Sequence, residues 1–156
     1  MSEHQHRYQI KVTWTGNRGT GTSGYREYDR SHVISAEGKP DIAASADPAF
    51  RGDATLWNPE ELLLASVSAC HKLWYLHFCA VSGVVVADYV DEPEGTMVLV
   101  RNAAGHFTEV VLKPVVTLAK GDPQTALELH EEAHEKCFIA NSVNFPIRIE
   151  PVIKTA

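Results

Sequence analysis

The sequence feature that most constrains the fold is an apolar segment, residues 62–81. Asn58 and Pro59 precede it in the order expected for the N-cap and first position of a helix, and two glutamates follow in the first turn, where the helix dipole is positive. Gly83 marks the C-terminal stop. The strongly polar residues within the segment are His71, Lys72 and His77. Because apolar residues occupy nearly every face, we predict a helix over residues 59–82 that is buried on all sides.

A helix of this kind needs more covering surface than a chain of 156 residues with little other helix provides. A second copy of the chain is therefore expected to cover it, which predicts an intertwined homodimer. A bilayer does not replace the second copy, because Lys72 in the middle of a span would carry a heavy penalty. With 44% hydrophobic and 22% charged residues and a net charge of −6, we expect one globular domain, residues 1–156, that binds neither nucleic acid nor a membrane.

Residues 1–14 lack the apolar stretch of a signal peptide, which predicts a cytoplasmic protein. The three cysteines, Cys70, Cys79 and Cys137, are an odd number without a close pair, unlike the framework of a secreted disulfide protein. We expect them to be reduced. A cysteine in that state acts through its reactivity or packs as a small buried residue.

Alternating polar and apolar residues predict strands before the helix. Residues 8–14 and a strand ending near residue 28 are expected to form a hairpin around a turn at residues 16–19. A third short strand covers residues 32–35. Residues 36–57 carry turn residues without a helical period, so we predict a long loop there.

Three further strands are predicted after the helix, at residues 84–90, 96–101 and 106–118. A turn at residues 102–105 joins the last two, and the three are expected to form an antiparallel meander. Asp122 and Pro123 open an amphipathic helix over residues 124–137, and a final strand covers residues 147–153. This order of elements predicts an α+β fold.

One motif, residues 130–134, matches the HExxH zinc pattern, in which two histidines one turn apart bind the metal and the glutamate is the base. No histidine follows His134, which leaves Glu135, Glu150 and upstream residues as the third ligand. The alternative is a solvated helix face that carries two histidines. We favour this alternative and predict no metal site.

Two other groups involve Cys70. Neither His71 nor His77 can act on it as a base within the helix, because adjacent residues point about 100° apart and His77 lies about 10 Å along the axis. Both histidines are expected to be buried and hydrogen-bonded to neighbours. Cys70 and Cys137 form a possible redox pair, but their separation of 67 residues (137 − 70) sets no distance.

The order of these motifs resembles the OsmC/Ohr family, the osmotically inducible protein C and organic hydroperoxide resistance proteins. That family has an Asn-Pro-Glu helix start, a cysteine ten residues after its first glutamate, and a second cysteine near the C-terminus. The matching segments here are residues 58–63, 68–71 and 134–137, with Asn141-Ser142 following. The resemblance covers nearly the whole chain and implies an OsmC-like fold, in which antiparallel sheets wrap around the long central helices of a homodimer.

The resemblance also implies a thiol-dependent peroxidase. Cys70 would form a sulfenic acid that Cys137 converts into a disulfide, and Glu60 matches the family glutamate. Two arginines remain candidates for its partner. Arg18 matches the hairpin-turn arginine of the hydroperoxide-resistance branch, and Arg51 resembles the arginine of the osmotically inducible branch; we lean towards Arg51. Cys79 has no family role and is expected to pack in the core.

Peroxide reduction by a cysteine explains why the thiols are accompanied by an arginine and a glutamate. A free cysteine is mostly protonated at neutral pH and burial protonates it further, so a cation must stand beside the reacting sulfur. An arginine meets this need and donates hydrogen bonds to the peroxide, while a glutamate orients the guanidinium. The resemblance further implies an organic hydroperoxide as substrate and a dithiol, of lipoyl type if the family precedent holds, as reductant, and it implies no cofactor. The rival hypothesis is an OsmC-like protein that binds a small apolar ligand without peroxidase turnover.

Overall fold

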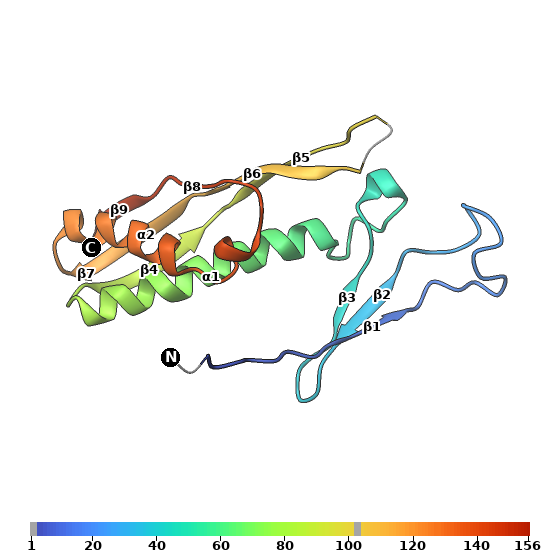
Figure 1. Cartoon of the computed structure of the whole chain (residues 1–156), viewed down its shortest axis with the longest axis horizontal. Helices are drawn as coiled ribbons and strands as arrows, with labels where there is room; N and C mark the ends of the chain where they lie inside the picture. Colours follow the sequence, from blue (N-terminus) through green and yellow to red (C-terminus); the bar gives the residue numbers. More distant parts are fainter. Residues whose placement is uncertain (1–2, 102–103) are drawn as a thin grey trace. The chain divides into compact units, whose positions relative to one another are not determined.

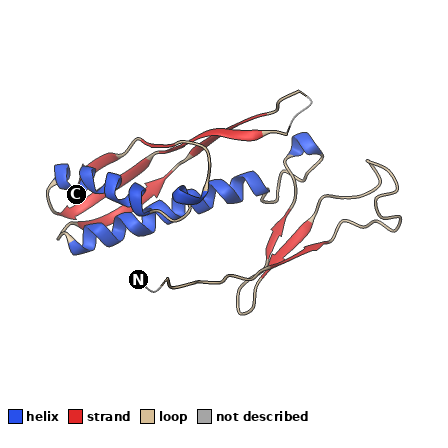
Figure 2. Ribbon diagram, viewed as in Figure 1, coloured by secondary structure: helices blue, strands red, loops and turns tan. Residues whose placement is uncertain are grey.

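The computed structural model describes residues 3–101 and 104–156. Two compact units, Met1–Leu62 and Leu63–Ala156, make up the chain, and each is described by itself. Figures 1 and 2 show their helices and strands. None of the helices in the described residues combines the length and the hydropathy that a bilayer crossing requires. The mixture of sheets and helices confirms the predicted α+β class.

The sheet of the N-terminal unit contains β1 (Lys11–Trp14), β2 (His32–Ser35) and β3 (Ile42–Ala44), which pair antiparallel in that order. The short strand predicted at residues 32–35 is confirmed. The predicted hairpin between the first strand and a strand ending near residue 28 is wrong, because β1 pairs with β2 instead.

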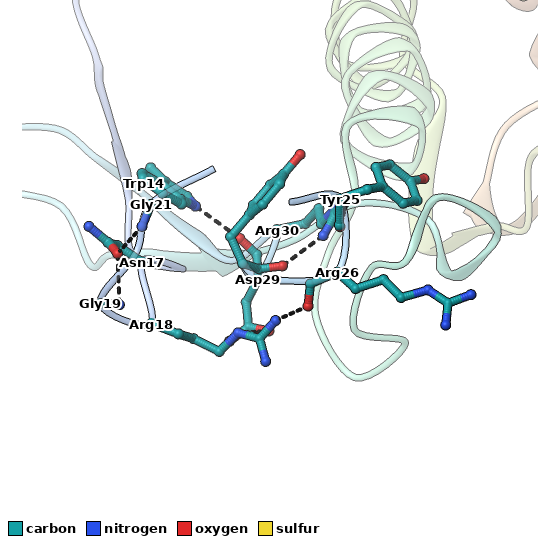
Figure 3. Close-up of polar contacts among 10 residues, drawn as sticks. Trp14, Asn17, Arg18, Gly19, Gly21, Tyr25, Arg26, Asp29 and Arg30 are labelled. Carbon is teal, nitrogen blue, oxygen red and sulfur yellow. Dashed lines mark hydrogen bonds and ion pairs between the residues drawn. The ribbon is translucent and has the colours of Figure 1, made fainter. Parts of the chain in front are cut away.

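The segment between β1 and β2 is a loop built around Asn17. The side-chain oxygen of Asn17 accepts hydrogen bonds from the backbone N–H groups of Gly19 and Gly21, both at 2.9 Å (Figure 3). These glycines have φ angles of 119° and 57°, a region that side chains with a Cβ rarely adopt. An extended strand therefore does not run through this segment.

The predicted long loop at residues 36–57 is wrong in part. It contains β3 and a short 3-10 helix, η1 (Pro48–Phe50), whose N-terminus is capped by Asp47. The Asp47 carboxylate accepts a hydrogen bond from the backbone N–H of Ala49 at 2.7 Å. A strand or helix of three residues carries too little periodicity to be recognised from the sequence.

Helix α1 (Pro59–Val81) begins at the predicted residue and ends one residue before the predicted end. Asn58 and Glu61 form a capping box: the Asn58 side chain accepts from the Glu61 N–H at 2.9 Å, and the Glu61 carboxylate accepts from the Asn58 N–H at 3.2 Å. Gly83 has a φ of 73°, as expected of a residue that stops a helix. The predicted N-cap and stop are confirmed.

One stripe of α1 is buried, and its residues repeat every four positions: Val67, His71, Tyr75 and Cys79. On another face Leu73 is 63% exposed. The prediction of burial on all sides included a second copy of the chain, so one chain does not test it. Its own elements bury this stripe and partly bury Trp74, Leu76 and Phe78. The covering of the other faces by a second copy remains a prediction.

The C-terminal unit contains two three-stranded sheets. The first has the order β4 (Val85–Asp91), β7 (Pro114–Lys120), β9 (Val152–Thr155). The second has the order β5 (Glu94–Val98), β6 (His106–Leu112), β8 (Ile147–Ile149).

The predicted antiparallel meander is wrong, although β5 and β6 do pair antiparallel. Lys113 divides the strand predicted at residues 106–118 into β6 and β7, which enter different sheets, and β4 pairs with β7. Likewise Pro151 lies between β8 and β9, which pair parallel with β6 and β7. The turn predicted at residues 102–105 includes residues 102 and 103, which lie outside the described residues.

Helix α2 (Pro123–Lys136) confirms the predicted amphipathic helix and ends one residue earlier than predicted. Asp122 caps it by accepting a hydrogen bond from the Thr125 N–H at 2.7 Å. The main core joins α1, α2 and the sheet of β4, β7 and β9 through Tyr75, Cys79, Val84, Val116, Leu118, Ala126, Leu129 and Ala133. This packing of α1 on α2 positions the two predicted redox cysteines.

Candidate thiol site

Cys70 and Cys137 are neighbours in the C-terminal unit. Cys70 lies within α1 and is half-buried, whereas Cys137 directly follows the last residue of α2 and is buried. Burial, followed by the proximity of the Cys70 thiol, raises the pKa of Cys137 to about 11. The backbone N–H of Ala140 lies 3.5 Å from the Cys137 sulfur and acts in the opposite direction. The fold thus brings together two thiols that the sequence alone could not place.

A pocket of about 360 Å³ opens beside Cys70. Its lining residues are Cys70, Leu73, Trp74, His77 and Phe138. Trp74 and Phe138 meet edge to face, with their ring centroids 5.3 Å apart. Because Phe138 directly follows Cys137, the pocket wall belongs to the same two segments that carry the thiols. This lining suits an apolar group bound next to the Cys70 sulfur.

His77 and Cys79, both on α1, differ in their surroundings. His77 is exposed and lies edge-on to Trp74 at 5.8 Å, so its predicted burial is wrong. Cys79 is buried next to Tyr75, and burial raises the pKa of its thiol. The prediction that Cys79 packs in the core is confirmed.

His71 is buried, as predicted, and its partner is His130 on α2. Nε2 of His71 lies 2.9 Å from Nδ1 of His130, and the Tyr75 ring stacks on His130 at a centroid distance of 3.8 Å. Burial, with a smaller effect of nearby His134, lowers the pKa of His71 to about 4. Burial and the nearby His71 lower the pKa of His130 to about 3. Near neutral pH both rings are neutral, so one donates and the other accepts the shared hydrogen bond.

The HExxH motif lies at a second pocket, of about 440 Å³, lined in part by His130 and His134. His130 is buried and already bonded to His71, so the predicted solvated face is wrong for this residue. Within residues 3–101 and 104–156, no three His, Cys, Asp or Glu side chains are grouped so that they could hold a metal ion. The motif here supplies a contact between helices.

Glu60 lies in the first turn of α1, in the N-terminal unit. Its Oε2 atom is buried and has no hydrogen-bond partner among the described residues. A buried carboxylate oxygen is costly unless a donor or a cation pairs with it. This atom is therefore suited to receive an arginine, and among the ion pairs of the described residues it receives none.

Arg18 is engaged within its own loop. Its guanidinium donates to the backbone oxygen of Arg26, and its Nε lies 3.7 Å from a carboxylate oxygen of Asp29 (Figure 3). The side chains of Arg18 and Asp29 are 50% and 62% exposed. In this position Arg18 is a half-exposed turn residue.

Arg51 follows η1 and has a φ of 63°, a left-handed conformation that is unfavourable for a side chain with a Cβ. The adjacent Gly52 approaches the backbone of Ala46 so closely that a Cβ there would lie 1.6 Å from the Ala46 oxygen. The guanidinium carbon of Arg51 lies 5.8 Å from the centre of the Tyr25 ring. Arg51 therefore lies in a tight bend, and its guanidinium lies over the Tyr25 ring.

A family model described as OsmC-like protein matches residues 52–152. The chain belongs to the OsmC-like family. An OsmC-like protein of unknown function from Vibrio cholerae is 31% identical, with a TM-score of 0.83 over 97% of this chain and 100% of that one. The uncharacterized protein YmaD of Bacillus subtilis is 26% identical over 96% of this chain and 95% of its own length.

A crystal structure of an organic hydroperoxide resistance protein, OsmC, from Legionella pneumophila has the same fold, with a TM-score of 0.67 at 14% identity over 97% of this chain and 99% of that one. The OsmC-like fold predicted from the sequence is confirmed by these similarities.

Sequence reasoning about this OsmC-like chain missed the bond between His71 and His130, which lie 59 residues apart. A signal for His130 was present. Ala126 and Ala133 lie four residues before and three residues after it, so all three share the apolar face of the amphipathic helix. A histidine on that face needs a buried partner, and the helix predicted at residues 59–82 offered one.

Proposed function

We propose that this OsmC-like protein is a thiol-dependent peroxidase that reduces organic hydroperoxides. The observation that carries the proposal is Cys70, half-buried on the wall of an apolar pocket, with the Cys137 thiol next to it. The shared fold with an organic hydroperoxide resistance protein supports the same chemistry.

In the first step, the Cys70 thiolate attacks one oxygen of the peroxide. The O–O bond breaks, Cys70 becomes a sulfenic acid, and the other oxygen leaves as an alcohol after it takes up a proton. In the second step, Cys137 gives its proton to the sulfenic acid oxygen as its sulfur attacks the Cys70 sulfur. The S–S bond forms, the S–O bond breaks, and the oxygen leaves as water. Because its pKa is raised to about 11, Cys137 still holds that proton at neutral pH.

A dithiol reductant then returns the protein to its starting state. It donates two electrons by thiol–disulfide exchange, restores both cysteines as thiols, and is itself oxidised to a disulfide. We propose a lipoyl-type dithiol, on the family resemblance, and a reducing cytoplasm as the place of turnover.

Glu60 and an arginine are assigned to stabilising the Cys70 thiolate. The buried, unpartnered Oε2 of Glu60 among the described residues supports its role as the acceptor for a guanidinium. Arg51 is the preferred cation, because the contact of its guanidinium in the described chain is with the Tyr25 ring. Arg18 is the second candidate, and its guanidinium already contacts Arg26 and Asp29.

The proposed active unit is an intertwined homodimer of single-domain chains. The exposed apolar residues of α1, including Leu73 at 63% and Val81 at 68%, support a covering partner. Glu60 and Cys70 are ten residues apart on a helix, or about 15 Å along its axis, so they cannot touch within one helix. The proposal therefore pairs Glu60 of one chain with the thiol site of the other.

Stopped-flow mixing of the reduced protein with cumene hydroperoxide tests the proposed function. Two thiols per chain should disappear rapidly, and peptide mapping should identify a disulfide between Cys70 and Cys137. The Cys79→Ser variant is the matched control and should lose the same two thiols at the same rate. A protein that binds the hydroperoxide but keeps its thiols would be a ligand-binding member of the family, and the peroxidase proposal would be wrong.

A further inference from the structure

Two buried histidines take no part in the proposed chemistry. His71 and His130 are 1% and 2% exposed, and the 2.9 Å contact between their rings crosses from α1 to α2. The rings lie nearly parallel, with an interplanar angle of 10°. The pair is therefore a directional link between the two helices that carry the thiol site.

Packing alone does not account for this pair. After the shared bond is formed, Nδ1 of His71 and Nε2 of His130 are buried without a partner among the described residues. One of these atoms carries a hydrogen and the other a lone pair, and each lost its water on burial without gaining a hydrogen bond. Two apolar side chains of similar volume would avoid both losses. A role other than core filling is therefore indicated.

The position of the pair suggests that role. His71 directly follows Cys70 on α1, and His130 lies seven residues before Cys137 (137 − 130). The backbone N–H of Cys137 bonds to the oxygen of His134 at 3.3 Å, so Cys137 moves with the last turn of α2. Hydrogen bonds weaken steeply with misalignment, whereas the hydrophobic effect has no preferred direction. The hydrogen bond between His71 and His130 therefore fixes the position of α2 along the axis of α1.

We propose that His71 and His130 are positioning residues, which set the register of α1 against α2 and thereby hold the thiols of Cys70 and Cys137 next to each other. This inference rests on the proposed pairing of the two cysteines. The fixed register gives the Cys137 thiol a high effective concentration at Cys70, and this stabilises the disulfide between them.

The test measures the stability of the disulfide without any peroxide. Reduced protein is equilibrated with mixtures of reduced and oxidised dithiothreitol. Oxidised dithiothreitol takes two electrons and two protons from the Cys70 and Cys137 thiols, which become a disulfide. Alkylation and mass spectrometry give the fraction of the Cys70–Cys137 disulfide. The variants are His71→Gln, whose amide can still bond His130, and His71→Met, which is of similar length and cannot.

His71→Met should lower the equilibrium constant for disulfide formation at least tenfold, a rise of about 30 mV in reduction potential for this two-electron couple. His71→Gln should stay within threefold of the wild type. Tyr75→Phe is the matched control, because it removes a different hydrogen bond between the same helices, 2.9 Å long, from Tyr75 to the Ala126 oxygen. This control should also stay within threefold.

The inference is overturned if His71→Met stays within threefold of the wild type, or if Tyr75→Phe lowers the constant as much as His71→Met. If His71→Met does not fold, His130→Asn and His130→Leu repeat the comparison from the other side, and equal constants for these two overturn it as well. A wild-type chain that forms the disulfide but does not reduce peroxide would contradict the proposed function alone. A wild-type chain that forms no such disulfide would overturn both.

Discussion

Cys137 and Cys70 differ in their surroundings although they are neighbours. Cys137 is buried and its pKa is raised to about 11, so it is a protonated thiol at neutral pH. Cys70 is half-buried and lines the apolar pocket. Because the thiolate rather than the thiol is the nucleophile, Cys137 does not compete for peroxide. The surroundings thus favour Cys70 as the sulfur that reacts first.

Replacing each cysteine in turn tests these assignments. Cys70→Ser should show no peroxide turnover. Cys137→Ser should undergo one rapid oxidation of Cys70 and then stop, because its sulfenic acid has no resolving thiol and oxidises further in excess peroxide. Cys79→Ser should turn over normally. Trapping of the sulfenic acid with dimedone and mass spectrometry measure each step. A Cys79→Ser variant as inactive as Cys70→Ser would show that the resolving and packing cysteines are assigned wrongly.

Replacement of the two arginines identifies the cation. Arg51→Ala should slow peroxide reduction roughly 10²-fold, the scale of losing one preorganised charge donor, and should move the pH profile of Cys70 alkylation to higher pH. Arg18→Ala should have little effect on either. The opposite result would exchange the two assignments, and an unshifted profile in both variants would exclude an arginine-activated thiolate.

Helices α1 and α2 contact each other through polar groups as well as apolar ones. Tyr75 donates a hydrogen bond to the Ala126 oxygen and stacks on His130, and His130 bonds His71. Both histidines must be neutral in this packing, because burial penalises their charged forms. The contact between the two helices therefore depends on pH.

We expect the free energy of unfolding to fall on acidification between about pH 6.5 and pH 5. The pKa values of His71 and His130 are lowered from 6.5 to about 4 and about 3, so in this range the unfolded chain binds more protons than the folded one. The free energy of unfolding should fall by about 1.4 kcal/mol per pH unit for each histidine in this range. Above pH 6.5 these two histidines should no longer lower it. Urea denaturation at pH 7, 6 and 5 measures it.

Two variants control this pH experiment. His106→Gln removes an exposed histidine and should keep the wild-type slope. The double variant His71→Met with His130→Leu should lose most of the slope, because the titrating groups are absent. An equal slope in the double variant and the wild type would place the pH dependence elsewhere in the molecule.

At the scale of the whole molecule, the single chain leaves large apolar side chains exposed. They include Leu73 and Phe138, which are 63% and 67% exposed and both line the pocket beside Cys70. Glu60 has a buried oxygen without a partner among the described residues. Both features support an assembly in which the partner chain covers α1.

Mixing two inactive variants tests whether the site is shared between chains. Cys70→Ser lacks the reacting thiol and Glu60→Ala lacks the arginine acceptor, so each homodimer should be inactive or slow. A heterodimer contains one site with both residues if Glu60 acts across the interface, and should regain up to half of the wild-type activity per dimer. Heterodimers that form, as shown by differential tags, but stay inactive would contradict a shared site.

The sequence by itself determined the features that depend on neighbouring residues. The start of α1 follows from Asn58 and Glu61, its end from Gly83, and the start of α2 from Asp122. Caps and stops act over three or four residues, so their partners can be read in the order of the chain. The spacing of Cys70 from the Asn-Pro-Glu start likewise indicated the family, because the motif is local.

Only the tertiary structure decided which distant segments meet. It paired β4 with β7 rather than with β5, and it placed His71 against His130 and Cys70 beside Cys137. Such contacts join residues far apart in sequence, and their distance depends on how all the elements pack around one core. Periodicity states which face of an element is buried, but it does not state what buries it.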